Sequence, residues 1–436
     1  MNTERWRVAR GGLEREQWRK LQALLAAIVP ANEFQARKLN PFGTFSSLKD
    51  FRTRCPFTIK TELSADQLAH PPYGTNLTFP FERYTRCHQT SGSMGEPLRW
   101  LDTNESWSGL LDQWTQIYEA ARVTAADRCF FAFSFGPFLG FWTAFEAAVR
   151  LGGLCIPGGG MSSATRLRVI LANRATVLCC TPTYALRLAE VAKAEAIDLA
   201  GALVRLVIVA GEPGGSVPAT REAISKAWNG ARVFDHFGLT ETGPVGHECF
   251  AQPGLLRVLE AAYLAEVIDP GTGAAVAPGV AGELVLTTLD RSASPLLRYR
   301  TGDLVKALPP ERNPDDCVEL CLEGGILGRT DEMLLVRGVN VYPSAIEQLI
   351  RECGGIAEYR AEVKEERALA ELELHIEPEP GRDAEAVRTQ LERLVRERLT
   401  LRVPVKVLAP GSLPRFEMKA RRWARPTALK SGQTAP

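Results

Sequence analysis

The sequence has no excess of charge of either sign. Its 436 residues include 52 Lys and Arg and 51 Asp and Glu, so the formal net charge at pH 7 is +1. Proteins whose main partner is a nucleic acid usually carry a strongly basic surface. The charge balance therefore argues against nucleic acid as the partner of this chain.

Long apolar runs are also missing. No segment approaches the roughly 18 apolar residues that a membrane-spanning helix needs. The most apolar segment, residues 129–145, is interrupted by Ser134, Gly136 and Pro137. The N-terminal segment 1–22 is charged and contains no apolar centre of signal-peptide length. We therefore expect a cytoplasmic protein with no membrane partner.

Paired cysteine spacing is absent as well. The ten cysteines are scattered along the chain. Cys179 and Cys180 are adjacent within an apolar run, where cysteine behaves as a small buried hydrophobic residue. Because disulfides are rare in the reducing cytoplasm, we expect these thiols to be free.

Short apolar runs and helical patterns alternate through the middle of the chain. The apolar runs at 129–135, 176–181 and 204–211 alternate with helical patterns at 141–151, 184–195 and 217–228. Short strands separated by helices are typical of βαβ units. The pattern therefore predicts an α/β fold with a mainly parallel sheet.

The chain is too long for one ordinary hydrophobic core, and its pattern changes twice. Strand patterns dominate from about 255 to 320, and strands and helices alternate again after that. We expect a large N-terminal domain over 1–328, which includes the β-rich subdomain. We also expect a small, mobile C-terminal α+β lid domain over 329–425 and a disordered polar tail over 426–436.

The segment 90–97 gathers hydroxyls and glycines into one short turn after a predicted strand. Glycines let backbone N–H groups approach a phosphate closely, and hydroxyls add donors. No Gly-Lys-Ser/Thr follows, so the turn is not a Walker A loop. Taken alone, it is also compatible with an ordinary hairpin turn. Its candidate phosphate-binding residues are Thr90, Ser91, Gly92, Ser93 and Gly95.

Seven segments in collinear order identify a resemblance. They are TSGSMGEP (90–97), AGEPGG (210–215), FDHFGLTETG (234–243), GELVLTTL (282–289), LRYRTGD (297–303), GGILGRTDEMLLVRGVNVYPS (324–344) and LPRFEMKARR (413–422). Over about 85–423 the chain resembles the adenylate-forming superfamily, and within it the phenylacetate-CoA ligase family. The resemblance implies an AMP-forming ligase. Such an enzyme uses ATP and Mg2+ to activate a small-molecule carboxylic acid and passes the acyl group to coenzyme A.

The resemblance also assigns the catalytic residues. The acid carboxylate must approach the α-phosphate, so positive charge is required where these two anions meet. Thr240 and Glu241 occupy the family's catalytic turn, where Glu241 would hold Mg2+; a helix-capping acid is the alternative. Lys419 matches the lysine that reaches the α-phosphate and the acyl oxygen. Its alternative interpretation is a solvated charge in a basic stretch.

The nucleotide-binding residues follow from the same motifs. Asp303 matches the carboxylate that accepts the ribose hydroxyls, and Arg329 matches the arginine that contacts the ribose or a phosphate. Phe237 stands where the family usually has Tyr, so it keeps a stacking face without the hydroxyl; a core Phe is the alternative. The residues expected to line the adenine are Gly211, Glu212, Pro213, Asp235, His236 and Phe237.

Aromatic residues crowd the segment 130–142, where the family builds part of its acyl site. Such a density of rings suits a flat aromatic pocket, although core packing on a strand would use the same residues. We predict an aryl or arylacetic acid as substrate. The expected pocket residues are Phe135, Gly136, Phe141, Gly159 and Gly238.

Two further features are implied by the resemblance. Asp331 aligns with the hinge about which the C-terminal domain rotates between the two half-reactions. Some relatives carry a zinc site, for which His247, Cys249 and Cys317 are weak candidates. Zinc is disfavoured here because the cysteine spacing departs from the family's CxCG pattern.

Other functions stay open at this point. The same adenylate could be transferred to a carrier-protein phosphopantetheine or to an amine, and a degenerate, non-enzymatic nucleotide-binding fold is a third option. The joint retention of Glu241, Asp303, Arg329 and Lys419 argues against that third option. The resemblance also suggests a homodimer.

Overall fold

The computed structural model describes residues 3–90, 97–212, 214–314, 317–332, 334–336, 339–366, 369–416 and 422–424. Six predicted site residues lie outside these ranges, as does the tail from 425 onward. They are Ser91, Gly92, Ser93, Gly95, Pro213 and Lys419.

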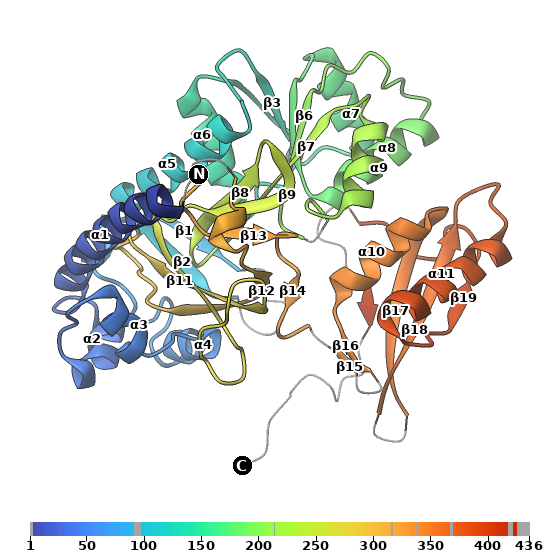
Figure 1. Ribbon diagram of the computed structural model, residues 1–436. Helices are drawn as coiled ribbons and strands as arrows, with labels where there is room; N and C mark the ends of the chain where they lie inside the picture. The colour runs from blue at the N-terminus through green and yellow to red at the C-terminus, as the bar shows by residue number, and fades with distance from the viewer. Residues whose placement is uncertain are drawn as a thin grey trace.

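Four α-helices open the chain and cover the β-rich part of the large domain (Figure 1). They are α1 (Thr3–Ile28), α2 (Glu33–Leu39), α3 (Leu48–Arg54) and α4 (Lys60–Ala69). The apolar stripe of α1, including Leu21 and Ile28, packs with Phe51 of α3 against Leu264 and Leu297. This amphipathic packing fixes the N-terminal helices on the sheet that carries the RYRTGD motif.

The largest sheet has eight strands in the order β13-β9-β8-β7-β6-β5-β3-β4. The strands β4, β3, β5, β6 and β7 pair in parallel, whereas β8, β9 and β13 pair antiparallel. Their bounds are β3 (Arg128–Phe131), β4 (Leu154–Pro157), β5 (Val177–Cys180), β6 (Leu206–Val209), β7 (Arg232–Leu239), β8 (Gly243–Cys249), β9 (Gln252–Val258) and β13 (Cys321–Glu323).

Helices cover both faces of this sheet, which explains why its strands β5 and β6 are apolar at every position. Val177 and Cys179 of β5 point into the core shared with α5 and α6, whereas Leu178 and Cys180 point into the core shared with α7, α8 and α9. The helices are α5 (Asn104–Ala120), α6 (Leu139–Leu151), α7 (Ser163–Ala172), α8 (Pro182–Ala194) and α9 (Pro218–Ala227).

Two smaller β structures complete the large domain. A four-stranded sheet has the order β10-β11-β12-β14, and the hairpin β1-β2 flanks the glycine-rich segment. Their strands are β1 (Tyr84–Gln89), β2 (Arg99–Thr103), β10 (Tyr263–Ile268), β11 (Ala281–Thr288), β12 (Tyr299–Lys306) and β14 (Gly328–Arg329). Short 3-10 helices cover Asn40–Phe42, Phe81–Arg83 and Pro310–Arg312.

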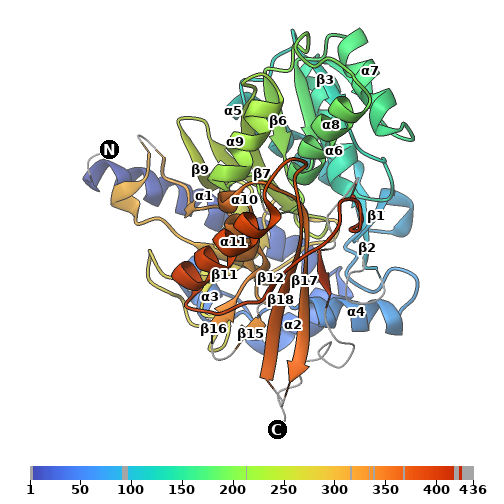
Figure 2. The ribbon, with the colours of Figure 1, turned by 90° about the vertical axis from the view of Figure 1, so that its right-hand side faces the viewer.

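The C-terminal part forms its own sheet and core, set beside the large domain (Figures 1 and 2). Its sheet order is β16-β15-β18-β17-β20, with β19 paired to β18. The elements are β15 (Leu334–Val336), β16 (Val339–Val341), α10 (Pro343–Cys353), β17 (Ile356–Glu366), β18 (Leu369–Pro378), α11 (Ala384–Leu399), β19 (Val405–Val407) and β20 (Trp423–Ala424). Both helices pack on this sheet through a separate apolar cluster.

The predicted fold class is confirmed: a large domain with parallel βαβ units and a small α+β domain after it. Strands up to Arg329 pair within the large domain, and strands from Leu334 pair within the C-terminal sheet. Within the described ranges, none of the helices combines the length and apolarity that crossing a bilayer requires.

Candidate active site

The candidate residues gather where the parallel strands of the large sheet end. Thr183 and Glu212 follow β5 and β6, and Asp235 lies in β7, which leads directly into the turn that holds Glu241. The carboxyl ends of parallel strands are the usual binding edge of an open α/β sheet. The strand β12 of the second sheet brings Asp303 to the same region.

Glu241 is buried and sits between two partners from other segments. Its side chain is 4% exposed, and its Oε1 lies 3.2 Å from the ammonium of Lys60. The same oxygen accepts a hydrogen bond of 3.3 Å from the hydroxyl of Tyr299. Mg2+ prefers oxygen ligands such as carboxylates, so it could replace the Lys60 ammonium beside Glu241 and use this oxygen as a ligand.

Lys60 is a residue that the sequence analysis missed. It opens α4, and the preceding segment is anchored to β12: the N–H of Thr58 donates to Arg298 O (3.0 Å), and the N–H of Arg300 donates to Thr58 O (2.9 Å). Thr58 is fully buried, and its hydroxyl donates to Leu297 O at 2.7 Å. These bonds bring Lys60 to Glu241, and a lysine at a helix start carries no motif that could have revealed it.

Arg291 is a second residue without a sequence signal. Its guanidinium makes two bonds to Asp102, Nε to Oδ1 at 2.7 Å and Nη2 to Oδ2 at 2.5 Å, and both residues are buried. Its Nη1 also donates to the carbonyls of Thr240 (2.8 Å) and Glu241 (2.9 Å). Arg291 therefore joins β2, the strand after the glycine-rich segment, to the turn of Thr240 and Glu241.

Asp303, Arg329 and Asp331 form one chain of ion pairs at the junction of the two domains. Arg329 Nη1 lies 3.0 Å from Asp303 Oδ1, and Arg329 Nε lies 2.9 Å from Asp331 Oδ1. Burial works to lower the pKa of Arg329, but the two carboxylates overcome it and raise that pKa above its ordinary value. The predicted ribose residue, the predicted arginine and the predicted hinge residue are thus brought together.

The predicted adenine residues lie near one another on adjacent strand ends. Glu212 Oε1 accepts a hydrogen bond of 2.8 Å from the N–H of Thr183. Asp235 accepts one of 2.6 Å from the hydroxyl of Ser216, and a Cβ added to Gly215 would lie 2.2 Å from its carboxylate. Burial raises the pKa of Asp235 to about 7. The carboxyl group is therefore buried and closely packed, and the residue beside it at position 215 must be glycine.

His236 and Phe237 face different surroundings. Burial lowers the pKa of His236 to about 3, so its ring is neutral, and its edge packs on Trp114 with centroids 4.4 Å apart. Phe237 is 7% exposed and belongs to the central core, where a Cβ on Gly246 would lie 2.5 Å from its ring. Between the two interpretations of Phe237, these contacts favour the core.

The aromatic segment forms a cluster of touching rings. Phe133 stacks on Phe141 at 4.3 Å, and Phe135 meets Trp142 and Phe145 edge-on at 5.2 and 5.5 Å. Phe135 has φ of +52°, a left-handed conformation that is unusual for a side chain of this size. This backbone turns its ring back into the cluster.

The glycines of the predicted acyl site divide into two groups. A Cβ on Gly159 would lie 3.3 Å from the Phe135 ring, and the carbonyl of Gly136 accepts a bond from Trp142 Nε1 at 3.0 Å. Both therefore border the aromatic cluster. Gly238 packs instead on the backbone of Gly243, whose oxygen would lie 2.5 Å from an added Cβ.

The weak zinc candidates are only partly assembled. Cys317 and Cys321 lie with their sulfurs 3.4 Å apart, and Cys249 packs beside them. His247 turns its Nδ1 to Glu248 O at 2.9 Å, and its ring stacks on Phe234. No three of these four side chains bring their ligand atoms within 4.8 Å of one another. Among the described residues, one other cluster does so.

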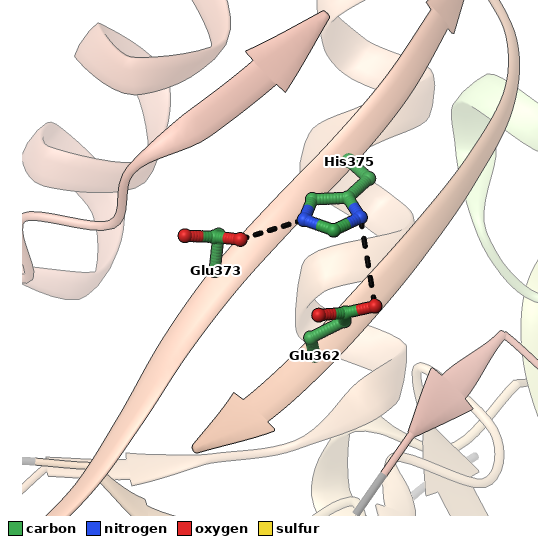
Figure 3. Close-up of side chains that lie close together, drawn as sticks. All are labelled: Glu362, Glu373 and His375. Atoms are coloured by element: carbon green, nitrogen blue, oxygen red, sulfur yellow. Dashed lines mark hydrogen bonds and ion pairs between the residues drawn. The ribbon is translucent and has the colours of Figure 1, made fainter. Parts of the chain in front are cut away.

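That cluster consists of Glu362, Glu373 and His375 on β17 and β18 (Figure 3). His375 Nε2 lies 2.6 Å from Glu373, which also accepts bonds from Lys406 (2.8 Å) and Lys364 (3.0 Å). These hydrogen bonds lower the pKa of Glu373 to about 2, and the bond from Lys406 has the largest effect. Because lysines already neutralise the carboxylate, the cluster is an ion-pair network of the sheet surface and no metal site is assigned to it.

Comparison with known proteins places this geometry in context. A family model described as AMP-binding enzyme matches residues 89–289, and a model of the AMP-binding enzyme C-terminal domain matches 338–424. The chain is 30% identical to the phenylacetate-coenzyme A ligase of Thermus thermophilus, over 92% of this chain and 93% of that protein. It is 29% identical to the phenylacetate-coenzyme A ligase of Escherichia coli, over 93% and 92%.

A solved structure is similar over almost the whole chain. It is a 2-hydroxyisobutyryl-CoA ligase in the postadenylation state with R3-HIB-AMP, which is 29% identical and matches with a TM-score of 0.89 over 96% of this chain and 90% of that one. The same ligase in the thioesterification state, with 2-HIB-AMP and CoA, matches with a TM-score of 0.70. Both structures are states of one ligase, so the difference in TM-score reflects a difference in conformation and not in sequence. The structure of this chain is therefore more similar to the postadenylation state than to the thioesterification state.

Proposed function

The chain belongs to the phenylacetate-coenzyme A ligase family, and from this membership we propose that it activates an aromatic carboxylic acid with ATP and transfers the acyl group to coenzyme A. The single observation that carries the proposal is the buried Glu241, which bonds to Tyr299 of β12, a residue that also interacts with the charges of Asp303 and Arg329. This arrangement supports a site for a magnesium-bound nucleotide at the sheet edge.

In the first half-reaction, the acid carboxylate attacks the α-phosphorus of ATP. A P–O bond forms, the bond to the β-phosphate oxygen breaks, and pyrophosphate leaves. Mg2+, held by Glu241, would neutralise phosphate oxygens when bound. Arg291 fixes the backbone of Thr240 and Glu241, so the carboxylate is pre-organised before the nucleotide arrives. Lys419, assigned from its motif alone, supplies the cation that follows the moving charge.

In the second half-reaction, the thiol sulfur of coenzyme A attacks the acyl carbon and AMP leaves as the acyl–phosphate bond breaks. We propose that the domain over 329–425 rotates about Asp331 between the two steps, relative to the domain over 1–328. The rotation would break the Arg329–Asp331 ion pair of the present arrangement. Asp331→Pro is expected to leave adenylation measurable and to block thioester formation; equal loss of both would contradict the hinge.

The aromatic cluster around Phe133, Phe135 and Phe141 supports an aryl or arylacetic acid as substrate. The alternative acceptors are an amine and the phosphopantetheine of a carrier protein. The phosphopantetheine presents the same thiol as coenzyme A. We also propose that the protein is cytoplasmic, which its ten free cysteines support. That it forms a homodimer is proposed from family membership alone.

A pyrophosphate-release screen tests the proposal. Purified protein is given ATP, Mg2+ and a panel of aromatic and aliphatic acids, with and without coenzyme A. Pyrophosphate release that is highest with aromatic acids, together with a thioester and AMP when coenzyme A is present, is the expected result. Glu241→Gln is the matched inactive control. Adenylate formation without any thioester would favour the carrier-protein or amine alternative, and no release with any acid would overturn the proposal.

A further inference from the structure

The described part of the C-terminal domain contacts the large domain through α8. Arg422, three residues after Lys419, places its Nη1 3.4 Å from the hydroxyl of Thr183 in the first turn of α8. Thr183, Arg187 and Glu190 of this helix line a small pocket together with Arg415 and Arg422 of the C-terminal domain. Figure 1 shows the end of the large domain that carries α8 and α9 facing α10, and α9 contacts α10 directly.

Arg422 is fixed on its own side of the interface. It is buried, its Nε lies 2.5 Å from Glu358 of β17, and its Nη1 lies 3.4 Å from Glu347 of α10. Its guanidinium also lies over the ring of Tyr359, 5.2 Å from the centroid. Arg422 therefore moves with the C-terminal domain as a rigid unit, and its bond to Thr183 forms only when that domain is in a suitable arrangement.

Thr183 is fixed on the other side. Its backbone N–H donates to Glu212 Oε1 at 2.8 Å, and Glu212 belongs to the loop that is expected to line the adenine. Thr181 caps the same helix by accepting from the N–H of Tyr184, and Pro182 begins it. The first turn of α8 is thus tied to the nucleotide loop through its backbone, which leaves the Thr183 hydroxyl as the group that meets Arg422.

We propose that Thr183 is a positioning residue for the first half-reaction: by bonding to Arg422, its hydroxyl holds the C-terminal domain in the arrangement in which the acyl-adenylate is formed. This inference rests on the proposed function, since it requires two half-reactions with different domain arrangements. The present structure is more similar to the postadenylation state of the related ligase, with its bound acyl-AMP, than to the thioesterification state, so the contact belongs to the arrangement that precedes thioester formation. Rotation of the C-terminal domain carries Arg422 away with its own partners and breaks the bond to Thr183.

The test separates the two half-reactions in the full chain. Thr183→Val keeps the shape of the side chain and removes the hydroxyl, while the backbone bond to Glu212 remains. We expect the acid-dependent rate of pyrophosphate release to fall about five-fold, the effect of one ordinary hydrogen bond. Thioester formation from coenzyme A and separately synthesised acyl-adenylate is expected to stay at the wild-type rate. Thr183→Ser, which restores the hydroxyl, is expected to recover adenylation.

A matched control is available on the neighbouring helix. The hydroxyl of Thr220 in α9 is buried and has no hydrogen-bond partner among the described residues, so Thr220→Val should change neither half-reaction. Unchanged adenylation in Thr183→Val, equal loss of both half-reactions, or failure of Thr183→Ser to recover would each overturn the inference. Thr183→Ala gives a second variant if Thr183→Val does not fold. A wild-type protein that releases no pyrophosphate would overturn the proposed function as well, so the two failures are distinguishable.

Discussion

The nucleotide end of the candidate site and its acyl end are assembled from different interactions. At the acyl end, aromatic rings from one short segment, 131–145, pack on one another. At the nucleotide end, charged side chains from segments far apart in the sequence are joined in pairs: Lys60 with Glu241, Asp102 with Arg291, and Asp303 with Arg329.

This difference determines what each end tolerates. A buried charge whose partner is removed keeps its desolvation cost without compensation, so the pairs of the nucleotide end resist change. Apolar side chains can repack around a substitution of similar volume at a modest cost. We infer that the nucleotide chemistry is held constant by the architecture, whereas the choice of acid is adjustable within the aromatic cluster.

The strongest test removes the most buried pair. Arg291→Met leaves Asp102 charged and buried without its partner, and such losses cost about 3–5 kcal/mol of unfolding free energy. The turn of Glu241 also loses two hydrogen bonds, so adenylation should fall steeply. Urea unfolding and pyrophosphate release measure the two effects.

The double variant Asp102→Asn/Arg291→Met is the control for this experiment. Removing the charge of the partner should recover part of the stability, because no buried carboxylate is left unpaired, but it should not recover adenylation. A single variant as stable as the wild type would remove the basis for calling the nucleotide end rigid.

The next effect concerns Lys60. Once Mg2+ takes the Glu241 oxygen, we expect the Lys60 ammonium to pair with the terminal phosphates of ATP. Lys60→Met removes this pairing and should weaken ATP binding about ten-fold, since a hydrogen bond to a charged group contributes about 1.5–3 kcal/mol. AMP, which lacks the terminal phosphates, should bind as in the wild type. Calorimetric titration without acid measures both. Lys306→Met, which removes a similarly exposed lysine from an ion pair on β12, is the control. Tighter binding of ATP would mean instead that Lys60 only blocks the metal position.

The same contrast explains what sequence could predict. Glu241, Asp303 and Arg329 lie in contiguous motifs, so their types and order are visible in the chain. The βαβ units could also be predicted from the sequence, because strands such as β5 carry apolar residues on both faces and therefore appear as short apolar runs. Lys60 and Arg291 were missed since each acquires its role only through folding: Arg291 meets Asp102 across 189 residues.

Phe237 shows a second limit of prediction from sequence. Its position in the motif permitted either stacking on adenine or burial, and the decision comes from Gly246 on the neighbouring strand, whose missing side chain leaves room for the ring. The acyl site is limited in the same way. Ring density is visible in the sequence, but the ring that stacks on Phe133 is set by the turn between β3 and α6.

A smaller effect is expected at the acyl end. Phe141→Leu removes the ring stacked on Phe133 and keeps an apolar side chain, so stability should change little. We expect kcat/KM for aromatic acids to fall about ten-fold relative to aliphatic acids, within the range that a hydrophobic pocket can discriminate, with the KM for ATP unchanged. Phe45→Leu, at a remote ring pair, is the control. Equal loss with both classes of acid would remove the assignment of these rings to the substrate.

The smallest effect tests an exception at the nucleotide end, a carboxyl group held mainly by burial. Burial raises the pKa of Asp235 to about 7, above its unfolded value of about 3.9, so the native state binds more protons than the unfolded state between these values. By linkage, the stability from this group is complete below about pH 4 and is lost as the pH rises to about 7. Asp235→Asn should therefore flatten the decline in unfolding free energy over this window, measured by urea unfolding at several pH values. Asp269→Asn, where backbone hydrogen bonds from Thr272 lower the pKa, should leave the decline unchanged. An Asp235→Asn protein with the wild-type slope would show that Asp235 is ionised in the native state, with Arg221 rather than burial controlling its charge.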